Sequence, residues 1–420
     1  MHEDTTSVRR LGVLSLLALA ALGALAACSS DGASSSGGTS GGTSGGLPDG
    51  GGLPDGALPD GGACPPAPTA VLEVKARKLA LAGDRVVFVD TAAGPAFYPG
   101  AAPDTKTFAI RSVKLDGTGD TTLYTPTTLH QINDLRVVGD TVYFLESERL
   151  PSGSEETRIF SMPVAGGAPT LVVFHADPEI LGDHDRLDAI AAVDATDLYV
   201  VRGLQLAATV WKVARAGGAE TLMYRGPVSS SPQLVGDALF FRSGSLNTGT
   251  SGLYKIGRIP TSTTSTALTP VGTAACKGDL VAGAFGLLCT GSQESAGKST
   301  LLSKWTLEGA GHAVIFDPGP KTSRETQIGP VVDGFVYVAP DGSTTSEDNL
   351  TKVPLAGGAP TIVACNRAQI PRRGDFTGGG SNEALVAELD MVATPTELVW
   401  VETSKPSGGT ESTKIYRAPR

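Results

Sequence analysis

The chain is poor in the residues that carry most enzyme chemistry. Aromatic residues make up 5% of its 420 residues, and it has 5 His and 5 Cys. It has no Cys-x-x-Cys pair, which argues against a thiolate zinc site. No Gly-x-Ser-x-Gly motif follows a predicted strand, where a nucleophile elbow needs it. We therefore expect no catalytic residues, no metal site and no cofactor.

Positive charge is also in short supply. The chain has 33 Lys and Arg against 43 Asp and Glu, for a formal net charge of −10. Phosphate binding needs clustered Lys and Arg, so this balance argues against a nucleic-acid partner. The balance is ordinary for a soluble secreted protein.

Long segments of helical periodicity are missing as well, whereas short strands around a Gly-Gly turn recur. Clear copies lie at residues 162–173, 213–223 and 352–363, and weaker copies lie at 113–123 and 305–315. Self-similarity at this scale indicates a repeat array.

Three strand signals recur in a fixed order, and each occurs seven times. The first is an apolar strand that ends near Gly-Asp, at residues 79–83, 135–139, 190–194, 233–236, 280–283, 328–333 and 391–394. The second is a β-branched or aromatic run, at 86–89, 142–145, 198–201, 238–241, 286–289, 335–338 and 398–401. The third begins at Ile110, Ile159, Val210, Leu253, Leu302, Leu350 and Ile415. With a fourth strand after the Gly-Gly turn, each unit is the four-stranded blade of a β-propeller. A two-sheet sandwich does not explain a sevenfold count.

The two ends of the repeat region complement each other. The seventh unit stops at its third strand, residues 415–420, and an unassigned strand lies upstream of the first unit, at residues 71–74. If that strand completes the seventh blade, the ring closes and exposed sheet edges are removed. We therefore predict an all-β, seven-bladed β-propeller over residues 70–420, closed by an N-terminal strand.

The repeats resemble the bacterial extracytoplasmic propellers of the TolB-like and YVTN-like kinds. Residues 114–119, which read Lys-Leu-Asp-Gly-Thr-Gly, are also similar to the Leu-Asp-Gly turn of YWTD-type blades. The resemblance covers about residues 70–420. It implies a propeller fold and an extracytoplasmic setting, but no particular activity.

A second resemblance concerns the N-terminus. The apolar run at residues 11–24 is short for a membrane span, and it leads into Leu-Ala-Ala-Cys at residues 25–28. This tetrapeptide resembles the lipobox of bacterial lipoproteins. The resemblance implies a signal peptide over residues 1–27 and an acylated Cys28, palmitate included, that anchors the protein in a membrane. Ser29 then favours the outer membrane. The alternative is an ordinary cleaved signal peptide.

Residues 28–69 form a linker in this interpretation. The segment is mostly Gly, Ser, Thr, Asp and Pro, and Leu-Pro-Asp-Gly starts at Leu47, Leu53 and Leu58. Such a composition buries too little apolar surface to offset its ordering entropy. We expect a disordered linker that holds the propeller away from the membrane. A ligand motif in the Leu-Pro-Asp-Gly repeats is the alternative.

The two faces of the predicted propeller differ. Tight Gly-Asp and Gly-Gly turns share one face, and long connections lie on the other, at residues 90–109, 174–189, 364–390 and 402–414. Three of these four connections meet near the closure. Long loops in compact domains are often functional, so we predict a binding surface there. Its candidate contacts are Arg367, Arg372 and Arg373, which can recognise carboxylate or sulfate groups, although a solvated loop is the favoured interpretation of these charges.

The resulting functional prediction is a lipid-anchored, monomeric protein that binds or scaffolds a protein or glycan without catalysis. One alternative is a propeller lyase or hydrolase with its site at the mouth of the central channel. Another is a structural component of the cell envelope. Trp211, Trp305 and Trp400 lie in predicted strands, which favours core packing over sugar-binding platforms.

Four cysteines remain besides Cys28. Cys276 is predicted to open the first strand of blade five and Cys289 to end the second, so a disulfide between them is favoured. Cys64 and Cys365 remain as a pair by arithmetic, although the strand directions place them toward opposite faces. That pairing stays open. The acidic stretch from His175 to Asp188 could bind Ca²⁺ or a transition metal, but a solvated loop is favoured because no helix or fixed His spacing makes the ligands converge.

Overall fold

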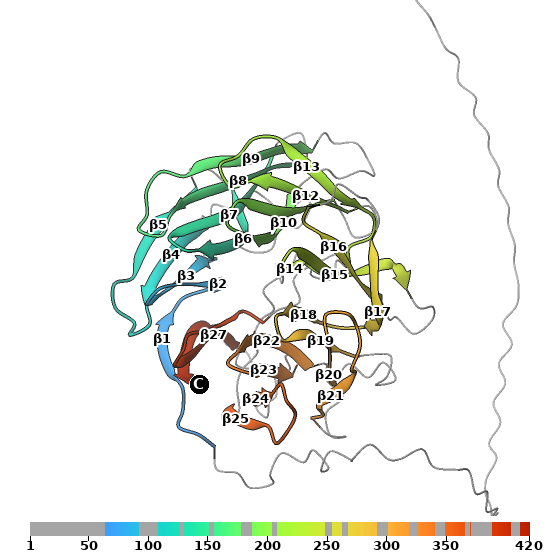
Figure 1. The fold of residues 1–420 in the computed structure, drawn as a ribbon. Coiled ribbons are helices and arrows are strands. Elements are labelled where there is room, and N and C mark those ends of the chain that lie inside the picture. Colours follow the sequence, from blue (N-terminus) through green and yellow to red (C-terminus); the bar gives the residue numbers. More distant parts are fainter. Residues whose placement is uncertain are drawn as a thin grey trace, which may run out of the picture. The chain divides into compact units, whose positions relative to one another are not determined.

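The computed structural model describes residues 64–91, 108–126, 130–150, 155–177, 187–203, 208–247, 254–262, 268–291, 301–318, 326–340, 349–365, 370, 389–404 and 412–420. Within these residues the secondary structure is entirely β, and the strands form seven four-stranded antiparallel sheets. In the same residues there is no helix of the length and apolar character that a membrane crossing requires. Figure 1 shows the sheets following one another around a common axis.

The blades are numbered in chain order. Blade one contains β2 (Ala76–Ala82), β3 (Arg85–Asp90), β4 (Ala109–Lys114) and β5 (Thr121–Tyr124). Blade two contains β6 (Gln131–Val138), β7 (Thr141–Arg149), β8 (Glu155–Pro163) and β9 (Thr170–Asp177). Blade three contains β10 (Leu187–Val193), β11 (Asp197–Arg202), β12 (Thr209–Ala214) and β13 (Glu220–Arg225). Blade four contains β14 (Gln233–Val235), β15 (Ala238–Asn247), β16 (Tyr254–Pro260) and β17 (Thr269–Cys276).

Blade five contains β18 (Leu280–Gly283), β19 (Gly286–Thr290), β20 (Leu302–Trp305) and β21 (Ala313–Phe316). Blade six contains β22 (Thr326–Val332), β23 (Phe335–Pro340), β24 (Leu350–Pro354) and β25 (Thr361–Ala364). Blade seven contains β26 (Met391–Ala393), β27 (Glu397–Ser404), β28 (Ser412–Pro419) and, at its outer edge, β1 (Thr69–Glu73). The first and second strand signals all fall in the expected strands. Leu253, the third signal of blade four, lies outside the described residues.

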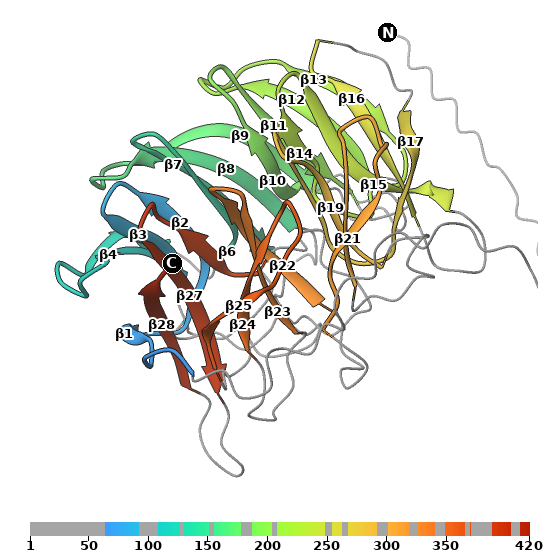
Figure 2. The ribbon, with the colours of Figure 1, turned by 60° about the horizontal axis from the view of Figure 1, so that its bottom comes forward.

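The predicted closure of the ring is confirmed. β1 pairs antiparallel with β28, with Thr69 opposite Arg417 and Glu73 opposite Lys414. Figure 2 shows β1 beside β28, close to the C-terminus. The two chain ends therefore complete one sheet, and the fold is a seven-bladed β-propeller.

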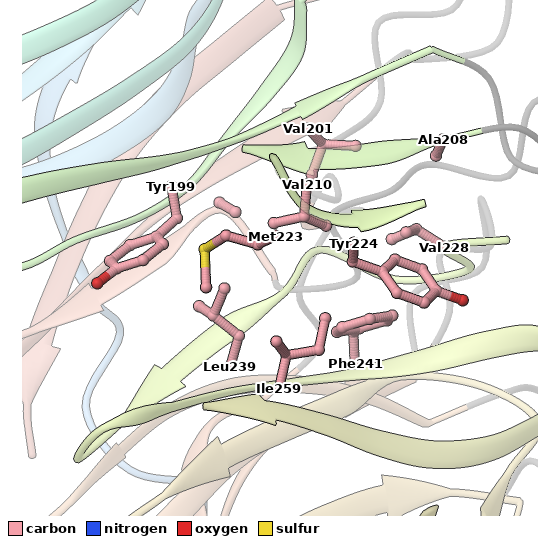
Figure 3. Packing of buried hydrophobic residues seen from close by; sticks show 11 residues of the cluster. Tyr199, Val201, Ala208, Val210, Met223, Tyr224, Val228, Leu239, Phe241 and Ile259 are labelled. Atoms are coloured by element: carbon pink, nitrogen blue, oxygen red, sulfur yellow. The ribbon is translucent and has the colours of Figure 1, made fainter. Parts of the chain in front are cut away.

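The hydrophobic core lies between the blades. Each second strand lies between two neighbouring blades and contains a buried apolar run, as in 86–89, where all four side chains are buried. Among the described residues, the buried apolar side chains form one cluster for each neighbouring pair of blades. Figure 3 shows the cluster between blades three and four, where Met223 packs against Leu239 and Tyr224 against Phe241. Trp305 and Trp400 are buried in such clusters, which confirms their predicted core role.

The Gly-Gly turns have a role in this packing. Gly217, in the turn between β12 and β13, has φ +83° and faces the preceding blade. A Cβ atom there would lie 3.1 Å from the Val172 carbonyl oxygen of β9. Glycine thus allows a left-handed turn and a close approach to the outer strand of the neighbouring blade. Gly166 and Gly357, in the equivalent turns of blades two and six, share the left-handed φ (+87° and +82°), which explains why glycine recurs at this position.

Both candidate disulfides are present, and each joins neighbouring blades. Cys276 is bonded to Cys289, with a Cα–Cα distance of 5.8 Å. The prediction that Cys276 opens blade five is wrong, because it is the last residue of β17 in blade four. The blade boundary is displaced because β17 runs three residues past the point expected from its partner strand, beyond a bulge near Gly257.

Cys64 is bonded to Cys365, again with a Cα–Cα distance of 5.8 Å. Cys365 directly follows β25 of blade six, and Cys64 precedes β1 of blade seven. The expected separation of the two cysteines is therefore wrong. Residues 64–68 contain no strand, and five residues can span about 16 Å, roughly the length of β1 itself. This segment brings Cys64 back to the end of β25.

Candidate functional site

The two faces of the propeller are built differently. We call the face that carries the turns between first and second strands, such as 83–84, 139–140 and 236–237, the tight-turn face. The opposite face, where second strands end and third strands begin, is the long-loop face. It carries connections as long as 91–108 and 365–390, whereas the first-to-second turns span two or three residues. The longest connections of the chain are therefore concentrated on the long-loop face.

The predicted lipidation and binding residues cannot be placed. Cys28, Arg367, Arg372 and Arg373 lie outside the described residues, as do residues 178–186 of the acidic stretch. The end of the Arg-containing connection is described, however. Asp390 is fully buried, and its carboxylate accepts hydrogen bonds of 2.6 Å from the backbone N–H groups of Lys78 and Leu79. The connection between blades six and seven is therefore fixed to blade one.

Asp390 belongs to a set of buried carboxylates that sequence reasoning missed. Asp134 accepts a hydrogen bond from the Ile190 N–H at 3.0 Å, which joins blades two and three. Asp279 accepts one from the Ile328 N–H at 3.2 Å, which joins blades five and six. The β-bulges in these first strands free backbone N–H groups from the sheet ladder, and a buried N–H needs another acceptor. These three aspartates therefore brace the ring near the long-loop face.

A second group that the sequence analysis did not identify lies between blades one and two on the long-loop face. Nδ1 of His130 lies 2.5 Å from Oε1 of Glu146, and Nε2 lies 2.9 Å from a carboxylate oxygen of Glu148. Tyr124, at the end of β5, donates a hydrogen bond of 2.7 Å to the other oxygen of Glu146. Burial and then this hydrogen bond raise the pKa of Tyr124 above its ordinary value. We call Tyr124, His130, Glu146, Glu148, Glu156 and Arg158 the blade-two corner.

The sheet register explains why the blade-two corner forms. Glu148 on β7 stands directly opposite Glu156 on β8, a like-charge pair that is unfavourable by itself. Arg158 binds both carboxylates, Glu148 at 3.1 Å, and its guanidinium also stacks on Phe174. The alternation of Glu146 and Glu148 beside Arg158 could have indicated this group from the sequence, because residues two apart share one strand face.

The blade-two corner is suited to holding strand ends in place rather than to binding a metal. The imidazole of His130 stands between Glu146 and Glu148, so the three side chains do not converge on a common point. Within the described residues, no three His, Cys, Asp or Glu side chains form a metal-binding group. Glu146 accepts a hydrogen bond from the Tyr124 hydroxyl, and Glu148 is paired with the Arg158 guanidinium. These contacts hold the acidic side chains of the corner in place on the long-loop face.

In the acidic stretch, the described residue His175 also makes a contact between blades. Nε2 of His175 lies 3.0 Å from Glu220 on β13 of the next blade. Glu220 is also bound by Arg202, whose guanidinium lies 4.2 Å from the ring centroid of Trp211. His175 therefore contributes to the contact between blades two and three. Asp183, His184 and Asp185 lie outside the described residues.

Comparison with known proteins supports the fold. No protein-family model matches the chain, and no curated protein does. Among solved structures, it is similar to the β-propeller domain of the Trilobed protease from Pyrococcus furiosus, with a TM-score of 0.52 and 12% identity, over 82% of this chain and 96% of that one. That domain is described as having an open velcro topology, whereas here β1 closes the ring.

Two further structures are more distant. TolB from Acinetobacter baumannii has a TM-score of 0.38 and 10% identity, over 80% of this chain and 65% of that one. An acylaminoacyl peptidase has a TM-score of 0.44 and 10% identity, over 79% of this chain and 51% of that one. This chain thus spans about half the length of that peptidase. The similarity to the Trilobed protease domain supports the β-propeller fold, and the two disulfides indicate an extracytoplasmic protein.

Proposed function

We propose that this protein is a lipid-anchored binding protein of the bacterial outer membrane, which holds a protein or glycan partner on its long-loop face and catalyses no reaction. The observation that carries the proposal is the asymmetry of the two faces. All connections of nine or more residues in the strand order open on the long-loop face, and none on the tight-turn face exceeds the eight residues of 261–268. Binding residues are commonly placed on loops that a rigid scaffold positions.

The closure supports the same surface. Asp390 attaches the end of the connection between blades six and seven to blade one. The connections at 91–108 and 365–390 are thereby fixed at their ends to the same part of the ring. Arg367, Arg372 and Arg373 belong to the second of these connections, and a guanidinium binds carboxylate or sulfate groups through two parallel hydrogen bonds.

The test compares two variants with equal loss of charge. Arg372→Ala/Arg373→Ala changes the long-loop face, and Lys114→Ala/Arg258→Ala removes two exposed cations from the region near the tight-turn face. Each full-length protein is immobilised and exposed to an extract of its own cell envelope, and the captured species are quantified. We expect capture of a specific species to fall about tenfold for the first variant, as for loss of a central interface contact, and to persist for the second. Equal capture by both variants would refute the proposed surface.

A further inference from the structure

One interface between blades differs from its neighbours on the tight-turn face. At Gly217, the turn between the third and fourth strands lies against the outer strand of the preceding blade. Gly357 occupies the same position in blade six, with φ +82°, yet a Cβ atom there would have no heavy atom within 4 Å. The blade-six turn therefore stands away from β21 of blade five.

The space between them is a groove of about 560 Å³. This is within the size range of natural ligand sites, about 300–1,000 Å³. Its walls are mainly apolar and include Phe285, Trp305, Val314, Ile315 and Leu355. Lys304 also lines the groove, and its ammonium group donates a hydrogen bond of 3.2 Å to the Leu355 carbonyl. An ammonium group has two further N–H donors for an incoming carboxylate.

We propose that residues 53–60 of this chain, which read Leu-Pro-Asp-Gly-Ala-Leu-Pro-Asp, dock in this groove. The Cys64–Cys365 disulfide supplies the first argument, because it fixes the end of this segment to blade six. Leu53 is eleven residues from Cys64, a reach of up to about 36 Å. Gly357 is eight residues from Cys365, so these two lie at most about 29 Å apart. The segment can therefore reach the groove from its anchor.

The chemistry of the segment supplies the second argument. Leu-Pro pairs favour the extended polyproline conformation, which aromatic-lined grooves recognise at low entropic cost. The Asp that follows each Leu-Pro complements Lys304. Because the disulfide makes the contact intramolecular, its effective concentration is on the order of millimolar, and weak intrinsic affinity suffices. The repeated Leu-Pro-Asp-Gly motif thereby acquires a role on the face opposite to the proposed partner surface.

Photo-crosslinking in the full chain tests this. The photoreactive residue p-benzoylphenylalanine replaces Phe285, at the edge of the groove, and cross-linked peptides are mapped by mass spectrometry. We expect cross-links to residues 53–60 of the same polypeptide. The variant Leu53→Ser/Leu58→Ser should lower their yield about tenfold or more, because two apolar side chains no longer enter the groove. The same probe at Asp140, in the corresponding turn of blade two, is the control for random collisions.

Three results would overturn the proposal. They are cross-links mainly to a second copy or to another protein, no cross-links at all from position 285, and an unchanged yield in the Leu53→Ser/Leu58→Ser variant. These results are independent of partner capture on the long-loop face, so this inference and the proposed function can fail separately.

Discussion

Blade five has two neighbours, and it packs against them differently. On the side of blade four, a Cβ atom at Gly309 would overlap the carbonyl oxygen of Val271 on β17, and the Cys276–Cys289 disulfide joins the two blades. On the side of blade six, the equivalent Gly357 is open and a groove separates the blades. The two glycines have nearly the same φ, +80° and +82°. The local turn is therefore the same, and the spacing between blades makes the difference.

Removal of the disulfides is expected to change the stability of these interfaces most. In the loop-entropy model, a crosslink stabilises more when it closes a longer loop. Cys64 and Cys365 are 301 residues apart in sequence, and Cys276 and Cys289 are 13 apart. We expect Cys64→Ser/Cys365→Ser to lower the free energy of unfolding by about 5 kcal/mol and Cys276→Ser/Cys289→Ser by about 3 kcal/mol. Guanidinium chloride unfolding measures both, and an equal or reversed order would contradict the role given to the first disulfide in the closure.

The two glycines provide a matched pair. Gly309→Ala and Gly357→Ala introduce the same backbone strain, of about 1 kcal/mol, because their φ angles are alike. Only Gly309→Ala also forces the Val271 carbonyl to move, so we expect a total cost of about 2–4 kcal/mol for that variant. The difference in unfolding free energy isolates the contact between blades four and five. Equal costs would mean that the two interfaces are packed alike.

Polar side chains that cross these two interfaces give a smaller effect. Gln233 of blade four donates a hydrogen bond of 2.8 Å to the Leu280 carbonyl and accepts one of 2.6 Å from the Ala282 N–H. Lys304 makes the corresponding link from blade five to blade six with one hydrogen bond. We expect Gln233→Ala to cost about 2 kcal/mol and Lys304→Ala about 1 kcal/mol, because the first removes the side-chain partner of two backbone groups of β18, the first strand of blade five. Thermal unfolding measures both losses of stability. A larger loss for Lys304→Ala than for Gln233→Ala would show that the interface between blades five and six is the tighter one.

The smallest effect on stability is expected at the turn between β10 and β11 in blade three, which is distant from blade five and serves as the baseline. Partial burial raises the pKa of Asp194, but hydrogen bonds from the N–H groups of Asp197 and Thr196 and from the Tyr199 hydroxyl outweigh it and lower the pKa below 3.8. A lowered pKa stabilises the fold above the ordinary value, and this stabilisation is lost as the pH falls through the folded-state value.

We therefore expect Asp194→Asn to lower the melting temperature slightly at pH 7, and the difference from the natural protein to shrink below pH 3.8. A difference that stays constant down to pH 2 would show that the turn depends on shape and not on the carboxylate charge.

Much of the fold was predictable because its determinants are local or periodic. The valine-rich second strands must be buried on both faces, and the glycine turns repeat between them. The closure followed from an unpaired strand at each end of the repeat region. The places of Cys64 and Cys276 were not predictable in the same way. They depend on a five-residue segment that doubles back and on a strand that continues past a bulge.

The candidate site was less accessible to sequence reasoning. Asp134, Asp279 and Asp390 act through bulges in the first strands, and a bulge leaves little trace in a hydrophobic pattern. The blade-two corner depends on the register between β7 and β8, which brings like charges together. The groove at Gly357 depends on the spacing between whole sheets. The Ala-Gly-Gly-Ala turns at Gly217 and Gly357 have the same local sequence, but only Gly217 lies close to the preceding blade.

The closure of the ring by β1 determines the faces, the position of Cys64 and the reach of residues 53–60. Hydrogen–deuterium exchange of the full chain measures it most directly. We predict that the backbone amides of 69–73 that bond to β28 exchange as slowly as their partners in 414–417, and that both speed up together in Cys64→Ser/Cys365→Ser. Fast exchange across 69–73 while 414–417 stays protected would show that blade seven holds together without β1, and would contradict the account.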